Sequence, residues 1–199
     1  MKGRWIVLIC VLSVFLMSAC VTDSILRGGD TSDTFHDIMY LKNNIHCQER
    51  QDWKRAVVYK ASYANFTDPG AGHFIVPVNS AVSIETSRHI IITDRTNGKR
   101  IQFEFNSKNM GMSADEYVGL IASPTEVSLN AFSQTDRKGI QDGKAYVGMS
   151  KDGVRTALGY PAAHRTPSLE HDIWIYWTNR FKARRIEFGE NGKVRQVGR

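Results

Sequence analysis

Strict alternation of apolar and polar side chains in residues 100–105 is the feature that most restricts how this chain can fold. Such alternation gives a strand one buried face and one face in water. The preceding segment 89–93 is a second candidate strand, and Asn97-Gly98 lies between the two. This pair is the favoured sequence for a tight type I′ turn, so the pattern predicts an antiparallel hairpin.

The region around this hairpin, residues 36–125, is predicted to be rich in β-structure. Five short strands at this spacing indicate a small, strongly bent sheet or half-barrel. A helix ends the region, because Ser113 and Glu116 form a capping box ahead of an apolar stripe. The three remaining strands are expected at residues 55–61, 74–77 and 81–85.

The C-terminal third, residues 126–199, has another element order, with two helices followed by a three-stranded antiparallel sheet. Gly159 is expected to be the left-handed C-cap of the second helix, and Pro161 prevents its continuation. A second pair, Asn191-Gly192, predicts a tight turn between the last two strands. The fold class predicted for the whole chain is therefore α+β. The expected elements are a helix over 130–140, a helix capped by Ser150, and strands over 173–177, 181–188 and 193–197.

The first twenty residues indicate export. Lys2 and Arg4 precede an apolar run, residues 5–19, that contains no acidic residue. As a helix these fifteen residues would reach only about 22 Å, short of the roughly 30 Å hydrocarbon core, so the run is typical of a secretory signal. It ends in Met17-Ser18-Ala19-Cys20, which resembles the lipobox of bacterial lipoproteins.

The lipoprotein resemblance implies that residues 1–19 are removed as a signal peptide and that Cys20 is acylated, with palmitate among its chains. Residues 20–35 would form a flexible tether. Val21, rather than an aspartate, follows the cysteine, which in such lipoproteins favours the outer membrane, facing the periplasm. The alternatives are an uncleaved anchor and an ordinary signal cleaved nearby.

Cysteine chemistry is restricted to Cys47 once Cys10 and Cys20 are accounted for, so an internal disulfide is not expected. A lone cysteine in an oxidising compartment is usually buried and inert, and an intermolecular disulfide is the alternative. A catalytic Cys47 with a distant His73 or His89 is the least favoured interpretation, because no third group is apparent to orient the base. The motifs of zinc sites, phosphate loops and nucleophile elbows are missing from the sequence, so we predict no enzyme, no metal and no cofactor.

The C-terminal third resembles the SmpA/OmlA domain, the BamE-like fold of outer-membrane assembly lipoproteins. The resemblance covers roughly residues 130–198 and implies a structural motif of helix ends and buried aromatic residues. It also implies protein–protein contact with outer-membrane or envelope assembly proteins. The residues that carry the motif are Gly148, Met149, Ser150, Val154, Leu158, Gly159, Pro161, Trp174, Tyr176 and Phe188.

Positive charge is concentrated in this same third, with 13 basic and 8 acidic residues in 126–199, or +5 of the total +6. The predicted export excludes nucleic acid as the partner. Two interpretations remain: a sheet edge protected by charge, or a surface for anionic lipid headgroups or an acidic protein. The candidate surface consists of Trp177, Arg180, Lys182, Arg184, Arg185 and Arg195.

Two functions follow from these observations. The first is a lipid-anchored accessory or scaffold protein in envelope assembly, without enzymatic activity. The second is a periplasmic ligand-binding or cell-wall-acting module that uses the β-rich region. A concave pocket lined by residues 55–105 would favour the second function, and a flat aromatic and basic patch near residues 174–195 would favour the first.

Overall fold

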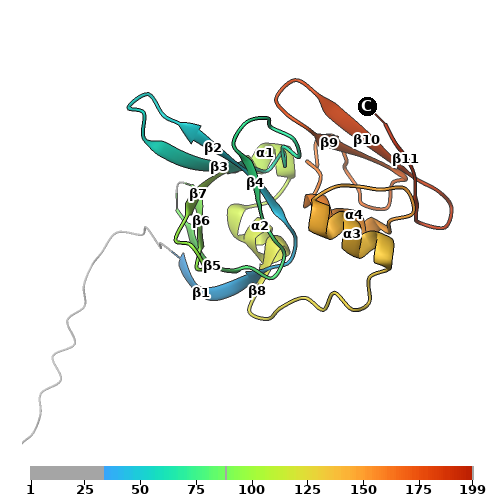
Figure 1. The fold of residues 1–199 in the computed structure, drawn as a ribbon, viewed down its shortest axis with the longest axis horizontal. Coiled ribbons are helices and arrows are strands. Elements are labelled where there is room, and N and C mark those ends of the chain that lie inside the picture. Colours follow the sequence, from blue (N-terminus) through green and yellow to red (C-terminus); the bar gives the residue numbers. More distant parts are fainter. Residues whose placement is uncertain (1–33, 88, 199) are drawn as a thin grey trace, which may run out of the picture. The chain divides into compact units, whose positions relative to one another are not determined.

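The computed structural model describes residues 34–87 and 89–198. The predicted signal peptide, Cys20 and the tether up to residue 33 lie outside the described residues. Residues 31–199 form one compact unit. Its described part is α+β, as predicted, with a curled eight-stranded sheet, a separate three-stranded antiparallel sheet and four helices (Figure 1).

The curled sheet has the strand order β4-β2-β3-β7-β6-β5-β1-β8, and all its neighbours are antiparallel except β3 and β7. The five predicted strands correspond to β3 through β7. Strands β1 and β2 are not among the predicted strands, and residues 34 and 35 of β1 fall in the predicted tether. The strands are β1 Thr34–Leu41, β2 Ile45–Gln51, β3 Val57–Ser62, β4 His73–Val76, β5 Ala81–Thr86, β6 Ile90–Asp94, β7 Arg100–Glu104 and β8 Ala122–Ser123.

Helix α2, Ala114–Ile121, packs against the inner face of this curled sheet, after the short helix α1, Ser107–Met110. The predicted capping box is present at its start. Tyr117 is fully buried, and its ring centroid lies 5.4 Å from that of Phe103 on β7. The alternation predicted for residues 100–105 therefore places the apolar face of β7 against α2, and leaves the polar face on the outside of the sheet.

The C-terminal part follows the predicted order, with α3 Gln134–Asp142, α4 Lys151–Leu158, β9 Ile173–Trp177, β10 Ala183–Phe188 and β11 Val194–Val197. The first helix starts later than expected because Ser133 caps it through a box with Asp136. Trp174, Tyr176 and Phe188 are buried on the inner face of the sheet. They form a second hydrophobic cluster with Met149, Val154 and Leu158. This cluster is separate from the one around α2.

The prediction of a type I′ turn at Asn97-Gly98 is wrong, although the hairpin between β6 and β7 exists. A type I′ turn needs positive φ at both central residues. Only Gly98, at φ 72°, is left-handed, while Asn97 is not. The loop is longer, because Asp94 accepts hydrogen bonds from the backbone of Thr96 and the side chain of Asn97. In the turn at 191–192, likewise, the glycine alone has positive φ.

Gly159 ends α4, but it is not the left-handed cap that we expected. Its φ of 78° combines with a ψ of −170°, a region that essentially only glycine occupies. The reason is close packing between the two parts of the fold. A Cβ at this position would lie 2.6 Å from Nδ2 of Asn65, in the loop after β3.

A polar seam joins the curled sheet to the C-terminal helices. Asn44 is buried, and its Nδ2 donates to the carbonyls of Ile140 (2.7 Å) and Ala157 (3.2 Å). Its Oδ1 accepts the backbone N–H of Val78 at 2.9 Å. Asn65 Nδ2 donates to the Tyr160 carbonyl. Hydrogen bonds therefore fix how the two hydrophobic clusters are placed relative to each other.

Candidate ligand-binding pocket

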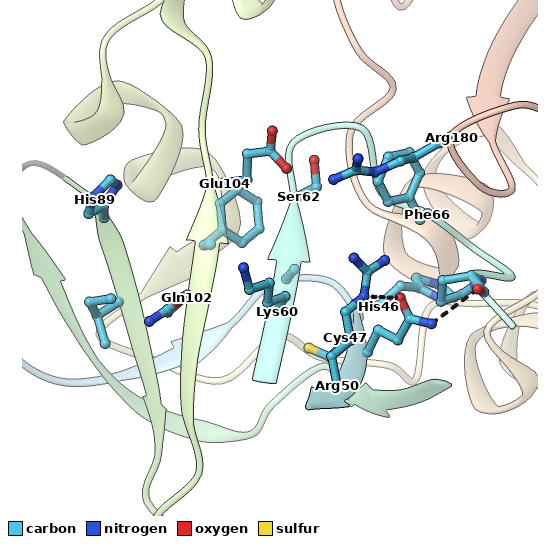
Figure 2. Close-up of a pocket in the computed structure, with 15 residues that line it drawn as sticks. His46, Cys47, Arg50, Lys60, Ser62, Phe66, His89, Gln102, Glu104 and Arg180 are labelled. Carbon is cyan, nitrogen blue, oxygen red and sulfur yellow. Dashed lines mark hydrogen bonds between the residues drawn. The ribbon is translucent and has the colours of Figure 1, made fainter. Parts of the chain in front are cut away.

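A hollow of about 300 Å³ lies on the outer, polar face of the curled sheet, across strands β2, β3, β7 and β6 (Figure 2). Cross-strand pairing explains why these side chains meet. Gln48 is opposite Lys60, which is opposite Gln102, and Ser62 is opposite Glu104. The hollow is lined by His46, Cys47, Gln48, Arg50, Lys60, Ala61, Ser62, Phe66, Pro69, His89, Ile91, Gln102, Phe103, Glu104 and Arg180.

Positive charge dominates the pocket. Arg50, Lys60 and Arg180 line it, and among the described residues none of the three has an ion-pair partner within 4.0 Å. Glu104 is the one acidic residue in the lining. In the view of Figure 2, the ends of Glu104 and Arg180 lie along one rim, and Lys60 and Arg50 lie across the hollow from them.

Two interactions hold Arg50 in place. Its Nε donates to Oε1 of Gln48 at 2.6 Å. The amide nitrogen of Gln48 in turn donates to the carbonyls of Pro69 (3.1 Å) and Ala71 (2.8 Å). The Arg50 side chain is thus anchored at one donor, while its terminal nitrogens, in this described part of the chain, make no hydrogen bond. A pre-positioned guanidinium with free donors can bind a carboxylate or phosphate with two hydrogen bonds.

Apolar side chains form the base and part of the remaining wall of the pocket. Phe66 and Ile91 are half-buried, and Phe103 lies at the base with only 1% of its surface exposed. A mostly apolar hollow with a few convergent polar groups is the usual form of a small-molecule site. The arrangement fits a small anionic compound with an adjoining apolar part.

Cys47 lines the same pocket with a buried thiol. Burial raises the pKa of its thiol to about 12, so the thiol stays protonated at neutral pH. Its Sγ contacts the carbonyl of Ile45 at 3.5 Å. His73, one of the two bases considered with it, pairs instead with His46, whose Nδ1 lies 3.1 Å from His73 Nε2.

The two histidines belong to the seam. His46 Nε2 lies 3.1 Å from the carbonyl of Ala157, which can only accept, so His46 donates from Nε2. Its Nδ1 must then accept the proton of His73 Nε2. Burial lowers the pKa of His46 from 6.5 to about 4, and burial also lowers the pKa of His73. Both rings are therefore neutral in the folded protein at pH 7.

The basic surface predicted in the C-terminal third is divided by the structure. Arg180 and Lys182 lie in the loop between β9 and β10, and Arg180 enters the pocket. Arg185 and Arg195 both pair with Glu187 at 2.9 Å. Arg184 shares a face with Ile186, on the side toward the core. Trp177 is half-buried, with the Arg165 guanidinium 5.7 Å from its ring centroid.

Sequence reasoning missed most of the pocket. Gln102 and Glu104 were correctly placed on the wet face of their strand by alternation. Arg50 was missed because β2 carries a polar run, Gln48 to Gln51, that hides its strand character. No apolar alternation in these four residues could have indicated the strand. Lys60 was assigned to a strand without any role.

Within 34–87 and 89–198, no group of three metal-ligating side chains gathers at one point. In the same ranges, no helix is long and apolar enough to cross a membrane.

Neither a protein-family model, nor a curated protein, nor a solved structure matches this chain. The resemblances to bacterial lipoproteins and to the SmpA/OmlA domain therefore stay predictions from the sequence.

Proposed function

We propose that this protein is a lipid-anchored binding protein of the bacterial envelope that holds a small anionic ligand in the pocket of its curled sheet. The observation that supports this proposal is the hollow lined by Arg50, Lys60 and Arg180, three cations that form no ion pair with the residues that the structure describes. A concave pocket is the feature that favours a ligand-binding function over a scaffold function. Its cations come from two parts of the fold, so the ligand would bridge them.

The ligand class follows from the lining. Arg50 and Arg180 suit a carboxylate or a phosphate, and Lys60 adds a point charge. Glu104 and Ser62, on the same rim as Arg180 and across the hollow from Arg50 and Lys60, would receive a hydroxyl or ammonium group. The volume of about 300 Å³ is at the small end for ligand pockets. Peptide fragments of the cell wall, which carry carboxylates and amines, are one class with this chemistry.

The test is calorimetric titration of the protein with soluble cell-wall peptide fragments and with inorganic phosphate. Replacing Lys60 or Arg180 by glutamine should weaken binding about tenfold or more each, the usual size for a charged hydrogen bond. The matched control is Arg185→Gln, a cation outside the pocket, which should leave affinity unchanged. If all three variants bind alike, or if no probe binds, the pocket proposal is wrong.

The location is part of the proposal and has its own test. The positive head, the short apolar run and Met17-Ser18-Ala19-Cys20 support acylation at Cys20 and anchoring at the outer membrane, facing the periplasm. Labelled palmitate should enter the native chain but not the Cys20→Ala variant. An unlabelled, soluble native chain would contradict the anchor without bearing on the pocket.

A second candidate function is an accessory role in outer-membrane assembly through a BamE-like domain. One observation favours it, the order of two helices and three antiparallel strands in residues 134–198. In this case the C-terminal sheet would contact envelope assembly proteins. Pull-down from detergent-solubilised envelopes should then recover such proteins, and a deletion strain should have reduced outer-membrane protein levels. Normal levels and an empty pull-down would argue against it.

A further inference from the structure

Two hairpin loops carry the most exposed large apolar side chains of the described residues. Trp53, between β2 and β3, is 87% exposed, and Phe181, between β9 and β10, is 92% exposed. Single apolar residues on a surface are ordinary. These two are distinguished by their neighbours, because each is flanked by basic residues: Lys54 and Arg55 in one loop, Arg180 and Lys182 in the other.

The two loops are held in similar ways. In the first, the N–H of Asp52 donates to the carbonyl of Ala56, and Oδ1 of Asp52 accepts the N–H groups of Lys54 and Ala56, both at 2.8 Å. The only acidic group of this loop is therefore occupied by its own backbone. The Lys54 ammonium lies 4.7 Å from the Trp53 ring centroid. This loop therefore presents an aromatic ring and a positive charge side by side.

In the second loop, the N–H of Thr178 donates to the carbonyl of Lys182, which closes five residues just as in the first loop. Oδ1 of Asn179 accepts the N–H groups of Phe181 (2.9 Å) and Lys182 (3.1 Å). Both loops are thus fixed by one side-chain oxygen that accepts two backbone donors. Hydrogen-bonded turns therefore hold the two aromatic residues out into solvent. Their exposure does not result from fraying of the strand ends.

The two loops lie on the same side of the compact unit, and strand β2, which leads into the first loop, comes close to the second. A hollow beside the pocket is lined by Arg50 at the end of β2 together with Phe181, Arg180 and Phe66. In Figure 1 both loops lie on the upper side of the compact unit. The loops that carry the two exposed aromatic residues and their basic neighbours therefore lie on one side of the molecule, and the second loop lies next to the pocket.

We infer that these two loops, Asp52–Ala56 and Thr178–Lys182, dock together on an anionic lipid bilayer. Aromatic rings prefer the boundary between headgroups and acyl chains, and each basic side chain near an anionic surface improves partitioning about fivefold. The basic loops complement the negative headgroups, and the rings lose their exposure to water by entering the interface. Docking would seat the pocket mouth close to the membrane. The inference does not depend on what the pocket binds.

The test uses the full chain reconstituted in vesicles and measures amide hydrogen exchange. With vesicles that contain phosphatidylglycerol, exchange in both loops should slow about tenfold relative to phosphatidylcholine vesicles, as expected when basic and aromatic groups partition together. The internal controls are two other hairpin turns. Residues 95–99 carry basic side chains without an aromatic residue, and residues 190–192 carry an acid; neither turn should change.

Two double variants separate the contribution of the aromatic rings from that of the basic charges. Trp53→Ser with Phe181→Ser keeps the charges, and Lys54→Gln with Lys182→Gln keeps the rings; each should abolish the protection. All four residues are exposed, so both variants should fold with unchanged circular dichroism. Arg180 is left intact because it lines the pocket, so ligand affinity should be unchanged in both variants.

Three results would overturn the inference. One is equal exchange in both kinds of vesicle, and another is equal slowing in the control turns. The third is protection of the loops by an isolated envelope protein but not by phosphatidylglycerol, which would assign them to a protein partner. None of these results would affect the pocket titration, so the failure of this inference and of the proposed function can be told apart.

Discussion

The outer faces of the two sheets treat charge in opposite ways. On the three-stranded sheet, Glu187 pairs with Arg185 and with Arg195. On the curled sheet, Lys60 and Arg50 line a concave surface, and no acidic group within residues 34–87 and 89–198 lies within ion-pair distance of either. Paired charges on a flat face keep a sheet soluble, whereas unpaired charges in a hollow are available to a ligand. Net charge per region, which favoured the C-terminal sheet, therefore did not locate the site.

The interiors also differ from the contact between them. Each sheet buries its own apolar cluster, but the seam that joins them is built from amides and histidine. Apolar contact alone would allow the two parts of the fold to slide past each other. Buried hydrogen bonds between them permit only one relative arrangement. This matters because Arg180 comes from one part and the rest of the pocket from the other.

The largest expected effect comes from breaking this seam. Asn44→Ala should lower the free energy of unfolding by about 4 kcal/mol, because it removes three hydrogen bonds and leaves the N–H of Val78 without its partner. Urea denaturation followed by circular dichroism measures the loss. Asn97→Ala, in the exposed turn between β6 and β7, is the control and should cost much less. A loss below about 1 kcal/mol for Asn44→Ala would mean that the seam contributes little.

The next effect is a dependence of stability on pH. The pKa of His46 is about 4 in the folded protein against 6.5 ordinarily, so the unfolded chain binds a proton first as the pH falls. Stability is then complete above pH 6.5 and falls by about 3 kcal/mol as the pH decreases to about 4. The lowered pKa of His73 acts in the same direction.

Thermal unfolding at a series of pH values measures this dependence. The His46→Gln variant should lose most of the slope between pH 6.5 and 4, whereas His171→Gln, at an exposed position, should retain it. The same slope in both variants would place the proton uptake elsewhere.

The smallest effect tests the comparison of the two outer faces directly. Glu187→Gln should cost about 0.5 kcal/mol, as is usual for exposed ion pairs, because it removes the partner of two arginines. Lys60→Gln in the pocket should cost nothing or stabilise slightly, since it relieves repulsion among unpaired cations. Chemical denaturation at low salt measures both. If Lys60→Gln destabilises more than Glu187→Gln, the pocket cations have partners in solution and the comparison fails.

Local signals were sufficient where an element depends on its own residues. Ser113 with Glu116 located α2, and alternation located β7 with its polar residues outward. The same rules failed where contacts with distant parts of the chain decide the local structure. Strand β2 was missed because its polar residues become strand only by pairing with β3 and β4. Gly159 has positive φ as foreseen, but its ψ is set by the approach of Asn65 from the other part of the fold.

By itself the sequence determined the α+β class, the capped helices and the faces of the best-patterned strands, because these depend on residues within one turn or one strand repeat. The tertiary structure alone decided where charges stay unpaired. Arg50, Lys60 and Arg180 are 130 positions apart at the extremes. These three side chains come together because of the strand order and the hydrogen-bonded seam. The periodicity of the sequence gives no information about either.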